Sequence, residues 1–460
     1  MAPELLSIAV VGHTNAGKTS LLRTLTRNKR FGEVSPRNAT TKYVSKTSVK
    51  IAGEPRLNLF DTPGFEDSNA FRQYIRQFEG NGSRKAALEA FLLSPEANGI
   101  YEQQAKVVRT LLDKIDVVFY VIDCTEEPLP KYLSELDVLT MCGRPVLPIL
   151  NFVSENETYT ESWSATLADR GLHIKVSFDA VTPKFGSEPK LYKKLGTLLE
   201  DRQKELDDIA SGLAVESETR KLAGLSAIAG LLVDAAAYRA EVPNDDEAAK
   251  KVQAIRMQVQ LRHAEQNCVK TLLEIFGFDR GDLTDTELPV MNSNAEDDLF
   301  SPEAFKAAST RLGIGAVIGT AIGLGVDIAL VGGSLGAGIA AGGAIGGAIA
   351  GYAKELFSWV RAKYQGLLFF IFDETTLAIL MERQLQLLAA LQLRAHAAQI
   401  ALERDAEPYE ESAWREIAKI ITKIRVHPEW CGMEKEPKLN IERADIISRI
   451  CDVYKPLELR

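Results

Sequence analysis

The stretch Gly12–Thr19, with the sequence GHTNAGKT, decides the fold of the N-terminal part of this chain. It fits the pattern G-x-x-x-x-G-K-S/T of a phosphate-binding loop. The apolar run Ser7–Val11 precedes it and predicts a buried strand, and Thr19–Leu25 follows it with apolar residues at helical spacing. A strand, a glycine-rich loop and a helix in this order direct backbone N–H groups and a helix N-terminus at phosphate oxygens. The sequence therefore predicts a nucleotide phosphate site here.

The residue types in this loop suggest individual roles. Lys18 is expected to reach the β- and γ-phosphates, and the hydroxyl of Thr19 is expected to ligate magnesium. The other positions are expected to line the phosphates. The predicted contribution of this region to the nucleotide site is Gly12, Asn15, Ala16, Gly17, Lys18, Thr19 and Ser20.

The 460-residue chain is long enough for two or three domains. Residues 1–205 alternate strand-like and helix-like segments, which predicts an α/β domain with a mostly parallel, doubly wound sheet. Residues 206–460 show almost no strand pattern, and this predicts a mainly α-helical domain. Helical periodicity is clear near 217–242, 245–276, 376–404 and 410–425, whereas the proline-interrupted residues 427–460 give no clear pattern.

The charge distribution disfavours one class of partner. The net charge is −9, and because residues 1–205 are nearly neutral, the acidic excess lies in residues 206–460. A nucleic-acid-binding domain carries a basic surface, so nucleic acid is not the partner that we expect. The five cysteines form no C-x-x-C pair, and the N-terminus has no basic region before an apolar core. These features predict free thiols, no signal peptide and a cytoplasmic location.

The segment Leu312–Ala353 is rich in Gly, Ala and Ile, and Asp327 is its only charged residue. Glycines recur at every fourth position, which lets helices approach closely. We expect a helical hairpin with Asp327 near its turn. Three interpretations stay open: a transmembrane hairpin, because the uncharged run is long enough to span a bilayer; an element that inserts into a membrane conditionally; and a close-packed helical pair in a soluble core.

A second motif, Asp61-Thr62-Pro63-Gly64, follows a predicted strand that ends at Phe60. Together with the phosphate loop, it resembles the Era-like (TrmE/Era/septin-type) branch of the translation-factor-related GTPases. The resemblance implies an α/β P-loop GTPase domain that binds GTP or GDP with magnesium. In that branch the aspartate, here Asp61, lies behind magnesium, and the glycine N–H, here of Gly64, senses the γ-phosphate.

The resemblance also assigns residues in the first switch. Asn38–Lys42 is similar to the Thr-Thr-Arg-like motif of this branch, in which the second threonine ligates magnesium. This role falls to Thr41, with Thr40 as the alternative. The implied metal ligands are then Thr19, Thr41 and Asp61, and the implied catalytic groups are Lys18, Thr41 and Gly64.

Two positions predict unusual catalysis. Several Era-like members have an asparagine at the position of Asn15 and use potassium beside the phosphates, so Asn15 could hold potassium or only shape the turn. Phe65 occupies the place of the water-positioning glutamine of classical small GTPases, and a phenyl ring cannot orient water. We expect slow hydrolysis, or hydrolysis that depends on potassium, on a nucleotide-dependent homodimer or on a group from elsewhere. Glu66 and Asp67 are candidates for that group.

The motif for base recognition departs from the family pattern Asn-Lys-x-Asp. The sequence here is Asn151-Phe152-Val153-Ser154. Asn151 is retained, the ring of Phe152 could stack on the base in place of the lysine stem, and Ser154 lacks the carboxylate that recognises guanine. Discrimination of guanine from adenine should weaken, unless Asp179 supplies the carboxylate.

The whole chain resembles a bacterial group of Era-like GTPases with a helical C-terminal domain of unknown function. We expect domains at 1–205 and 206–460, with an insertion at about 66–115 that contains helices near Gln73–Gly82 and Ala86–Leu93. The implied function is a GTP-binding switch with slow magnesium-dependent hydrolysis. Its helical domain would engage a membrane or membrane protein at the inner face of the bacterial inner membrane. The alternatives are a soluble RNA- or ribosome-associated GTPase and a nucleotide-binding interaction protein that does not hydrolyse GTP.

Overall fold

The computed structural model describes residues 4–28, 31, 44–80, 82–153, 159–180, 187–241, 247–278, 326–330, 368–393, 411–435, 437 and 440–455. The chain divides into two compact units. The first comprises residues 1–218 with 393–400, and the second comprises residues 219–392 with 401–460.

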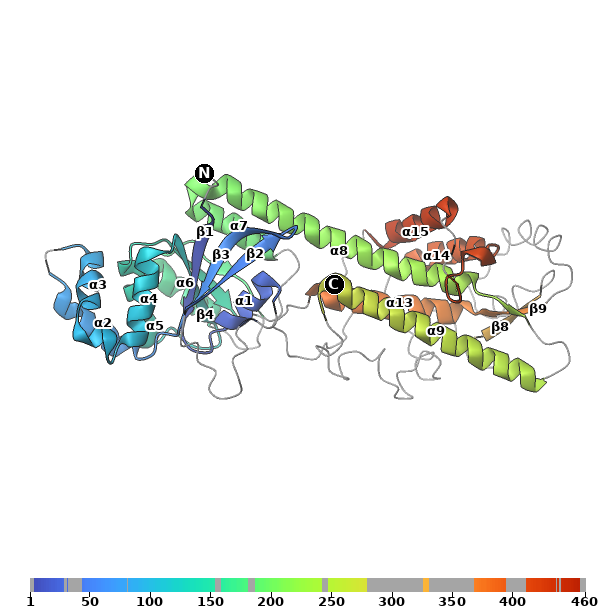
Figure 1. Ribbon diagram of the computed structural model, residues 1–460, viewed down its shortest axis with the longest axis horizontal. Coiled ribbons are helices and arrows are strands. Elements are labelled where there is room, and N and C mark those ends of the chain that lie inside the picture. The colour runs from blue at the N-terminus through green and yellow to red at the C-terminus, as the bar shows by residue number, and fades with distance from the viewer. Residues whose placement is uncertain are drawn as a thin grey trace. The chain divides into compact units, whose positions relative to one another are not determined.

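The first unit is built on a six-stranded sheet with the strand order β2-β3-β1-β4-β5-β6. Figure 1 labels β1 to β4 of this sheet. All neighbouring strands are parallel except β2, which pairs antiparallel with β3. This is the mostly parallel, doubly wound sheet expected from the sequence. The strands are β1 Leu6–Gly12, β2 Ser45–Ile51, β3 Glu54–Asp61, β4 Val117–Asp123, β5 Val146–Asn151 and β6 Val176–Ser177.

Helices bury apolar side chains on both faces of this sheet, because its parallel central strands are apolar on both sides. On one face lie α1 Lys18–Thr26, α7 Ser187–Leu198 and the beginning of α8 Gln203–Ala237, which contribute Leu21, Leu191 and Leu206 to one core. On the other face lie α2 Ser68–Ile75, α4 Glu102–Asp113, α5 Pro130–Met141 and α6 Thr160–Asp169, which contribute Phe71, Val108, Leu136 and Trp163 to another.

The segment between β3 and β4 contains α2, the 3₁₀ turn η1 Arg76–Phe78, α3 Arg84–Leu92, the 3₁₀ turn η2 Pro95–Asn98 and α4. We call α2–α4 the insertion. The predicted helix at Ala86–Leu93 corresponds to α3, but the one at Gln73–Gly82 is misplaced. The helix α2 begins at Ser68 instead, and its buried positions, Ser68, Phe71 and Ile75, recur at helical spacing.

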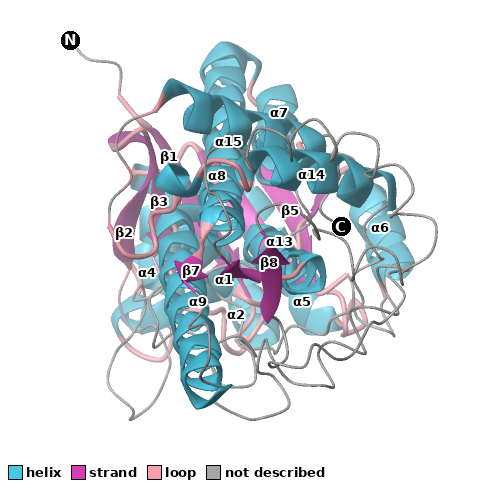
Figure 2. Cartoon of the chain, turned by 90° about the vertical axis from the view of Figure 1, so that its right-hand side faces the viewer, coloured by secondary structure: helices cyan, strands magenta, loops and turns pink. Residues whose placement is uncertain are grey.

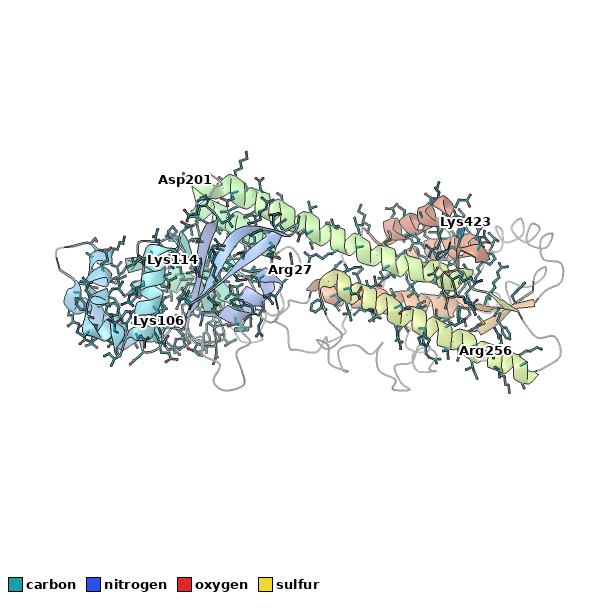
Figure 3. All side chains as sticks on the ribbon, in the orientation of Figure 1. Arg27, Lys106, Lys114, Asp201, Arg256 and Lys423 are labelled. Carbon is teal, nitrogen blue, oxygen red and sulfur yellow. The ribbon has the colours of Figure 1, made fainter. Side chains whose placement is uncertain are left out.

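Arg27 fastens the C-terminal end of α1 to neighbouring helices of the first unit, and Figure 3 labels this residue. Its guanidinium bonds Glu216 of α8 at 2.9 Å and approaches Glu188 of α7 at 3.4 Å. The other carboxylate oxygen of Glu216 accepts the N–H of Ala52, in the turn between β2 and β3, at 2.7 Å. The residues of α8 up to 218 are therefore part of the first unit's structure.

The second unit is mainly helical, as the sequence predicts, with a small sheet added. Its described helices are the remainder of α8, α9 Glu247–Phe276, α13 Glu374–Leu393, α14 Glu411–Ile424 and α15 Ile441–Tyr454, with the 3₁₀ turn η5 Pro428–Trp430. Their apolar faces form one core. At Gly224 of α8, an added Cβ would lie 2.6 Å from Cδ1 of Leu388, so α8 and α13 are in close contact.

The strands β7 Ala240–Glu241, β9 Leu368–Phe372 and β8 Val326–Leu330 form an antiparallel sheet in the order β7-β9-β8. Figure 2 labels two of them, β7 and β8. Asp327 pairs with Ile371 in this sheet. The expectation that Asp327 lies near the turn of a helical hairpin is therefore wrong, because Val326–Leu330, a run rich in branched apolar residues, adopts the extended state. The rest of the Gly-rich segment, 312–325 and 331–353, lies outside the described residues.

Polar side chains inside the second unit are bonded to one another. The carboxylate of Glu265 on α9 accepts bonds from Arg383 at 2.9 Å and Gln384 at 3.1 Å on α13. Asp234 of α8 bonds Arg443 of α15 at 2.8 Å. Burial raises the pKa of the Asp234 carboxyl, and the neighbouring Arg443 opposes this. In the part of the chain that is described, no helix is both long and apolar enough to cross a membrane.

Candidate nucleotide site

The loop between β1 and α1 leaves the N-terminus of α1 open. Gly17 precedes the helix with a left-handed backbone at φ 93°, and no side chain caps the first N–H groups. Asn15 is exposed and also left-handed, at φ 67°. The first N–H groups of a helix have no partner within it, and with the helix dipole they attract phosphate. The loop therefore has the geometry of a phosphate-binding site.

Two glycines of this loop are needed because neighbouring atoms approach the backbone closely. A Cβ on Gly12 would lie 2.4 Å from the carbonyl oxygen of Val121 in β4. A Cβ on Gly17 would lie 2.2 Å from Nδ2 of Asn151 at the end of β5. A larger residue at either position would push the loop away from the strand ends that support it.

Lys18 lies in the first turn of α1 and is only 9% exposed. Its ammonium donates to the carbonyl oxygens of Gly12 at 2.9 Å and His13 at 2.7 Å. Burial lowers the pKa of Lys18, and the negative charges of Asp61 and Glu135 oppose that change. The ammonium is thus held beneath the loop, close to the aspartate of the second motif.

The second motif meets the loop at the carboxyl end of the central strands. β3 ends at Asp61, which is 2% exposed and lies opposite Val10 of β1. The hydroxyl of Thr62 donates to the carbonyl oxygen of Val10 at 2.8 Å. A Cβ on Gly64 would lie 2.9 Å from Oγ1 of Thr14, so the glycine of the second motif lies against the phosphate loop.

The protein oxygens at this edge suit magnesium. Thr19 lies in the first turn of α1 and Asp61 at the end of β3, so a hydroxyl and a carboxylate are available. Magnesium in nucleotide sites is held by one or two protein oxygens, phosphate oxygens and water. No group of three or more His, Cys, Asp or Glu side chains within the described residues could hold a metal ion. Thr19 and Asp61 would hold magnesium only together with a nucleotide.

The three residues after Gly64 separate into one buried ring and two exposed carboxylates. Phe65 is fully buried, and its ring lies 6.2 Å from that of Phe71 in the insertion. Glu66 and Asp67 are exposed. The ring of Phe65 therefore lies in a core rather than in an open cleft.

At the other end of the site, Asn151 joins two loops. Its Nδ2 donates to the carbonyl oxygen of Ala16 at 2.9 Å, and its Oδ1 accepts the N–H of Ala180 at 2.9 Å. Asn151 is fully buried, and Asp179 next to Ala180 is buried as well. The retained asparagine therefore fixes the phosphate loop to the loop that follows β6.

Phe152 follows Asn151 in a left-handed conformation at φ 56°. A Cβ on Gly17 would lie 3.4 Å from Cζ of Phe152, so the tip of the ring is against the phosphate loop. Left-handed backbone at a bulky residue costs about 1–3 kcal/mol. This conformation therefore depends on the surrounding contacts, and it keeps the ring beside the nucleotide site.

Sequence reasoning missed a contact between His13 of the loop and the buried Glu135. Nδ1 of His13 lies 2.8 Å from Oε1 of Glu135 on α5, and the hydroxyl of Tyr120 donates to Oε2 of the same carboxylate at 2.8 Å. Glu135 is completely buried. The sequence pattern of the helix gives no sign that this glutamate is buried. A histidine inside a phosphate loop was the only available signal.

Some predicted site residues fall outside the described residues. These are Thr40 and Thr41 of the first switch and Ser154 of the base-recognition motif. Their roles stay predictions from the sequence. The described residues that lie together at the site are Gly12, Asn15, Ala16, Gly17, Lys18, Asp61, Gly64, Asn151 and Phe152, with Thr19 and Ser20 in the first turn of α1.

Comparisons with known proteins agree with this geometry. The family described as 50S ribosome-binding GTPase matches residues 7–152. The family described as a domain of unknown function, DUF3482, matches residues 164–452, which is more than half of the chain. The chain belongs to the DUF3482 family. In this member the DUF3482 region follows a P-loop GTPase domain of the Era and TrmE type, and the predictions of that domain and of a largely helical region after it are confirmed.

Individual relatives match parts of this DUF3482 protein. GTPase Der from Synechococcus sp. is 34% identical over 108 residues, which is 23% of each chain. The tRNA modification GTPase MnmE from Streptococcus thermophilus is 36% identical over 110 residues, covering 24% of this chain and 23% of MnmE. The match therefore spans about a quarter of these relatives. Among solved structures, Era from Aquifex aeolicus has 18% identity and a TM-score of 0.31, covering 43% of this chain and 57% of Era.

Proposed function

We propose that this chain is a GTP-binding switch protein that hydrolyses GTP slowly with magnesium. The observation that carries the proposal is the meeting of two phosphate motifs at one sheet edge, where Gly64 lies against Thr14 and Asp61 lies near Lys18. The names of the relatives, GTPase Der and tRNA modification GTPase MnmE, support a guanine nucleotide as the ligand.

Each residue of the phosphate end has a proposed task. Lys18 and the N-terminus of α1 bind the β- and γ-phosphates, and Thr19, Asp61 and Thr41 hold magnesium, which neutralises phosphate charge when bound. Gly64 presents its N–H to the γ-phosphate. The protein switches between two states when the contact between the Gly64 N–H and the γ-phosphate forms or is lost.

Slow turnover follows from the position of Phe65. Its buried ring cannot orient water, and Glu66 and Asp67, which follow it, are exposed to solvent. We expect turnover on the order of 10⁻³ s⁻¹ or below, the range of small GTPases without an activating partner. Asn15 supports a potassium-dependent rate, because it is exposed in the loop beside the proposed phosphate position.

Phosphate release from GTP tests the enzymatic part of the proposal. The full chain is incubated with magnesium and either potassium or sodium, and Asp61→Asn serves as the magnesium-site control. Slow release that is faster in potassium and lost in Asp61→Asn is expected. Release that Asp61→Asn leaves unchanged would contradict it. A flat curve, with GTP bound, would favour the alternative of a nucleotide-binding interaction protein.

We infer further that the helical region acts at a membrane or on a membrane protein. Both a monomer and a nucleotide-dependent homodimer are compatible with this role. The supporting observation is the uncharged, Gly-rich sequence after Asp327. Flotation of the full chain with vesicles of anionic bacterial lipids, with GDP or a non-hydrolysable GTP analogue, tests this inference. Salt-dependent binding to RNA without flotation would instead support the RNA- or ribosome-associated alternative.

A further inference from the structure

The backbone just after Gly64 is held by a side chain from the insertion. Nε2 of Gln104, on α4, donates to the carbonyl oxygen of Glu66 at 2.5 Å. Gln104 is only 5% exposed. Burying an amide is unfavourable unless its polar atoms are bonded, so a glutamine at this position indicates that this bond matters more than the apolar packing that a leucine would give.

A second contact holds the same piece of backbone through Phe65. Its ring belongs to a cluster in which Phe71 lies 5.0 Å from Phe91 and 5.2 Å from Tyr101. Phe71, Phe91 and Tyr101 all come from the insertion or its connections. The first residue after Gly64 is thus anchored by its side chain, and the second by its carbonyl oxygen.

The start of α2 is fixed in turn to α5. The hydroxyl of Ser68 donates to the carbonyl oxygen of Lys131 at 2.7 Å, and Ser134 donates to Asn69 at 2.7 Å. These contacts leave Gly64 with anchored backbone on its C-terminal side. On its N-terminal side, Thr62 is bonded to β1.

The direction of the Gly64 N–H therefore depends on how Glu66 is held. The two residues are joined by a turn in which the N–H of Glu66 donates to the carbonyl oxygen of Gly64 at 3.0 Å. If the Glu66 carbonyl lost its partner, the peptide planes of this short turn could rotate. The N–H that meets the γ-phosphate would then point in several directions.

We propose that Gln104 is a positioning residue for the γ-phosphate, acting from the insertion through the Glu66 carbonyl and Gly64. This inference rests on the proposed GTPase function. It gives the insertion a specific task, which is to make the preference for GTP over GDP depend on the packing of α4. GDP, which has no γ-phosphate, is bound equally well with or without this bond.

Gln104→Met tests the proposal, since methionine keeps the length of the side chain and lacks the N–H donor. Affinities for GDP and for a non-hydrolysable GTP analogue are measured by titration with fluorescent nucleotides, and turnover by phosphate release. We expect GDP affinity within about twofold of wild type, and a loss of about 5- to 50-fold in both analogue affinity and turnover, the range for one buried hydrogen bond. Lys106→Met, on the outer part of the same helix and labelled in Figure 3, should leave all three unchanged.

Gln104→Glu gives a second test that a purely structural role would not affect. When protonated, the carboxyl can donate to the Glu66 carbonyl, and when ionised it cannot. Burial favours the protonated form, so the turnover defect should be large at pH 9 and shrink towards pH 6 relative to wild type. A defect that does not vary with pH would contradict the proposal.

The outcomes distinguish failure of the proposed function from failure of the role of Gln104 alone. Wild-type protein that binds neither GDP nor the GTP analogue would overturn the proposed function and this inference with it. Wild-type protein that binds both, while Gln104→Met behaves like wild type or loses affinity for both nucleotides equally, would overturn the inference alone.

Discussion

The phosphate end and the base end of the nucleotide site are built differently. At the proposed phosphate end, backbone N–H groups, Lys18 and Asp61 lie together, and the sequence matches both the G-x-x-x-x-G-K-S/T pattern and Asp-Thr-Pro-Gly. At the base end, only Asn151 is retained, and Phe152 adopts a left-handed backbone beside the phosphate loop. Asn151 itself bonds protein groups, Ala16 and Ala180. This chain keeps the sequence patterns of phosphate binding and the asparagine that supports the base-recognition loop, while Phe152 and Ser154 replace the lysine and the aspartate of the Asn-Lys-x-Asp pattern.

Lys18→Met should have the largest effect on this comparison. It removes the ammonium that we propose binds the β- and γ-phosphates, and charge-assisted bonds to phosphate are among the strongest in proteins. We expect nucleotide affinity to fall by about 100-fold or more, since two such bonds contribute about 3 kcal/mol. Titration with fluorescent GDP measures the loss. The substitution also removes the donor to the carbonyl oxygens of Gly12 and His13, so circular dichroism and a urea titration must show that the variant is folded under the assay conditions.

Asn151→Ala should come next, with an effect on stability. It leaves the carbonyl oxygen of Ala16 and the N–H of Ala180 buried without their partner. Each such loss costs about 1–3 kcal/mol, so we expect the free energy of unfolding to drop by about 2–4 kcal/mol in urea titrations. The control is Asn98→Ala, whose exposed bond to Arg109 should contribute about 0.5 kcal/mol or less. Equal effects of the two substitutions would show that Asn151 is not a structural link.

Phe152→Ala should distinguish binding of the base from binding of the phosphates. If the ring stacks on the base, its loss should weaken GDP binding by about 1–2 kcal/mol, in the range of base stacking on aromatic side chains. Binding of inorganic pyrophosphate, which has no base, should be unaffected. Isothermal titration with both ligands distinguishes two roles of the ring. If the ring contacts the base, the substitution weakens only GDP binding. If the ring supports the phosphate loop, the substitution weakens binding of both GDP and pyrophosphate.

The smallest expected effect concerns the rate at which two buried thiols react. Burial raises the pKa of Cys124 to about 11 and that of Cys142 to about 12. At pH 8 at most about one molecule in a thousand then carries a thiolate at Cys124, so labelling by a thiol reagent should be slow. Because burial raises the pKa of Cys142 further than that of Cys124, labelling should be slower at Cys142. Mass spectrometry of labelled peptides measures both rates.

Much of the first unit could be predicted because its signals are local. The glycine loop, the strand ending at Asp61 and the apolar runs each fix a short piece of structure, and parallel strands place their carboxyl ends at one edge. The role of Gln104 could not be predicted, because its partner Glu66 lies 38 positions away and no local pattern joins them. The same holds for His13 and Glu135, which are 122 positions apart.

In the second unit, tertiary pairing overrode local pattern. Val326–Leu330 lies within a Gly- and Ala-rich context that predicts a helix, yet it pairs with Leu368–Phe372. The helix α15 was missed because prolines obscured its pattern. Asn440, however, was a readable start signal, since its side chain accepts the N–H groups of Glu442 and Arg443.

Isothermal titration of the full chain with GTP, GDP and ATP, in buffer containing potassium and magnesium, tests the central claim most directly. The account predicts that GTP and GDP bind at one site. ATP should bind more weakly than GTP. The difference in affinity should be smaller than a complete Asn-Lys-x-Asp motif would give, because Ser154 stands in place of the carboxylate that recognises guanine. Equal affinity for ATP and GTP, or no binding of any nucleotide, would contradict the assignment of this chain as a GTP-binding switch.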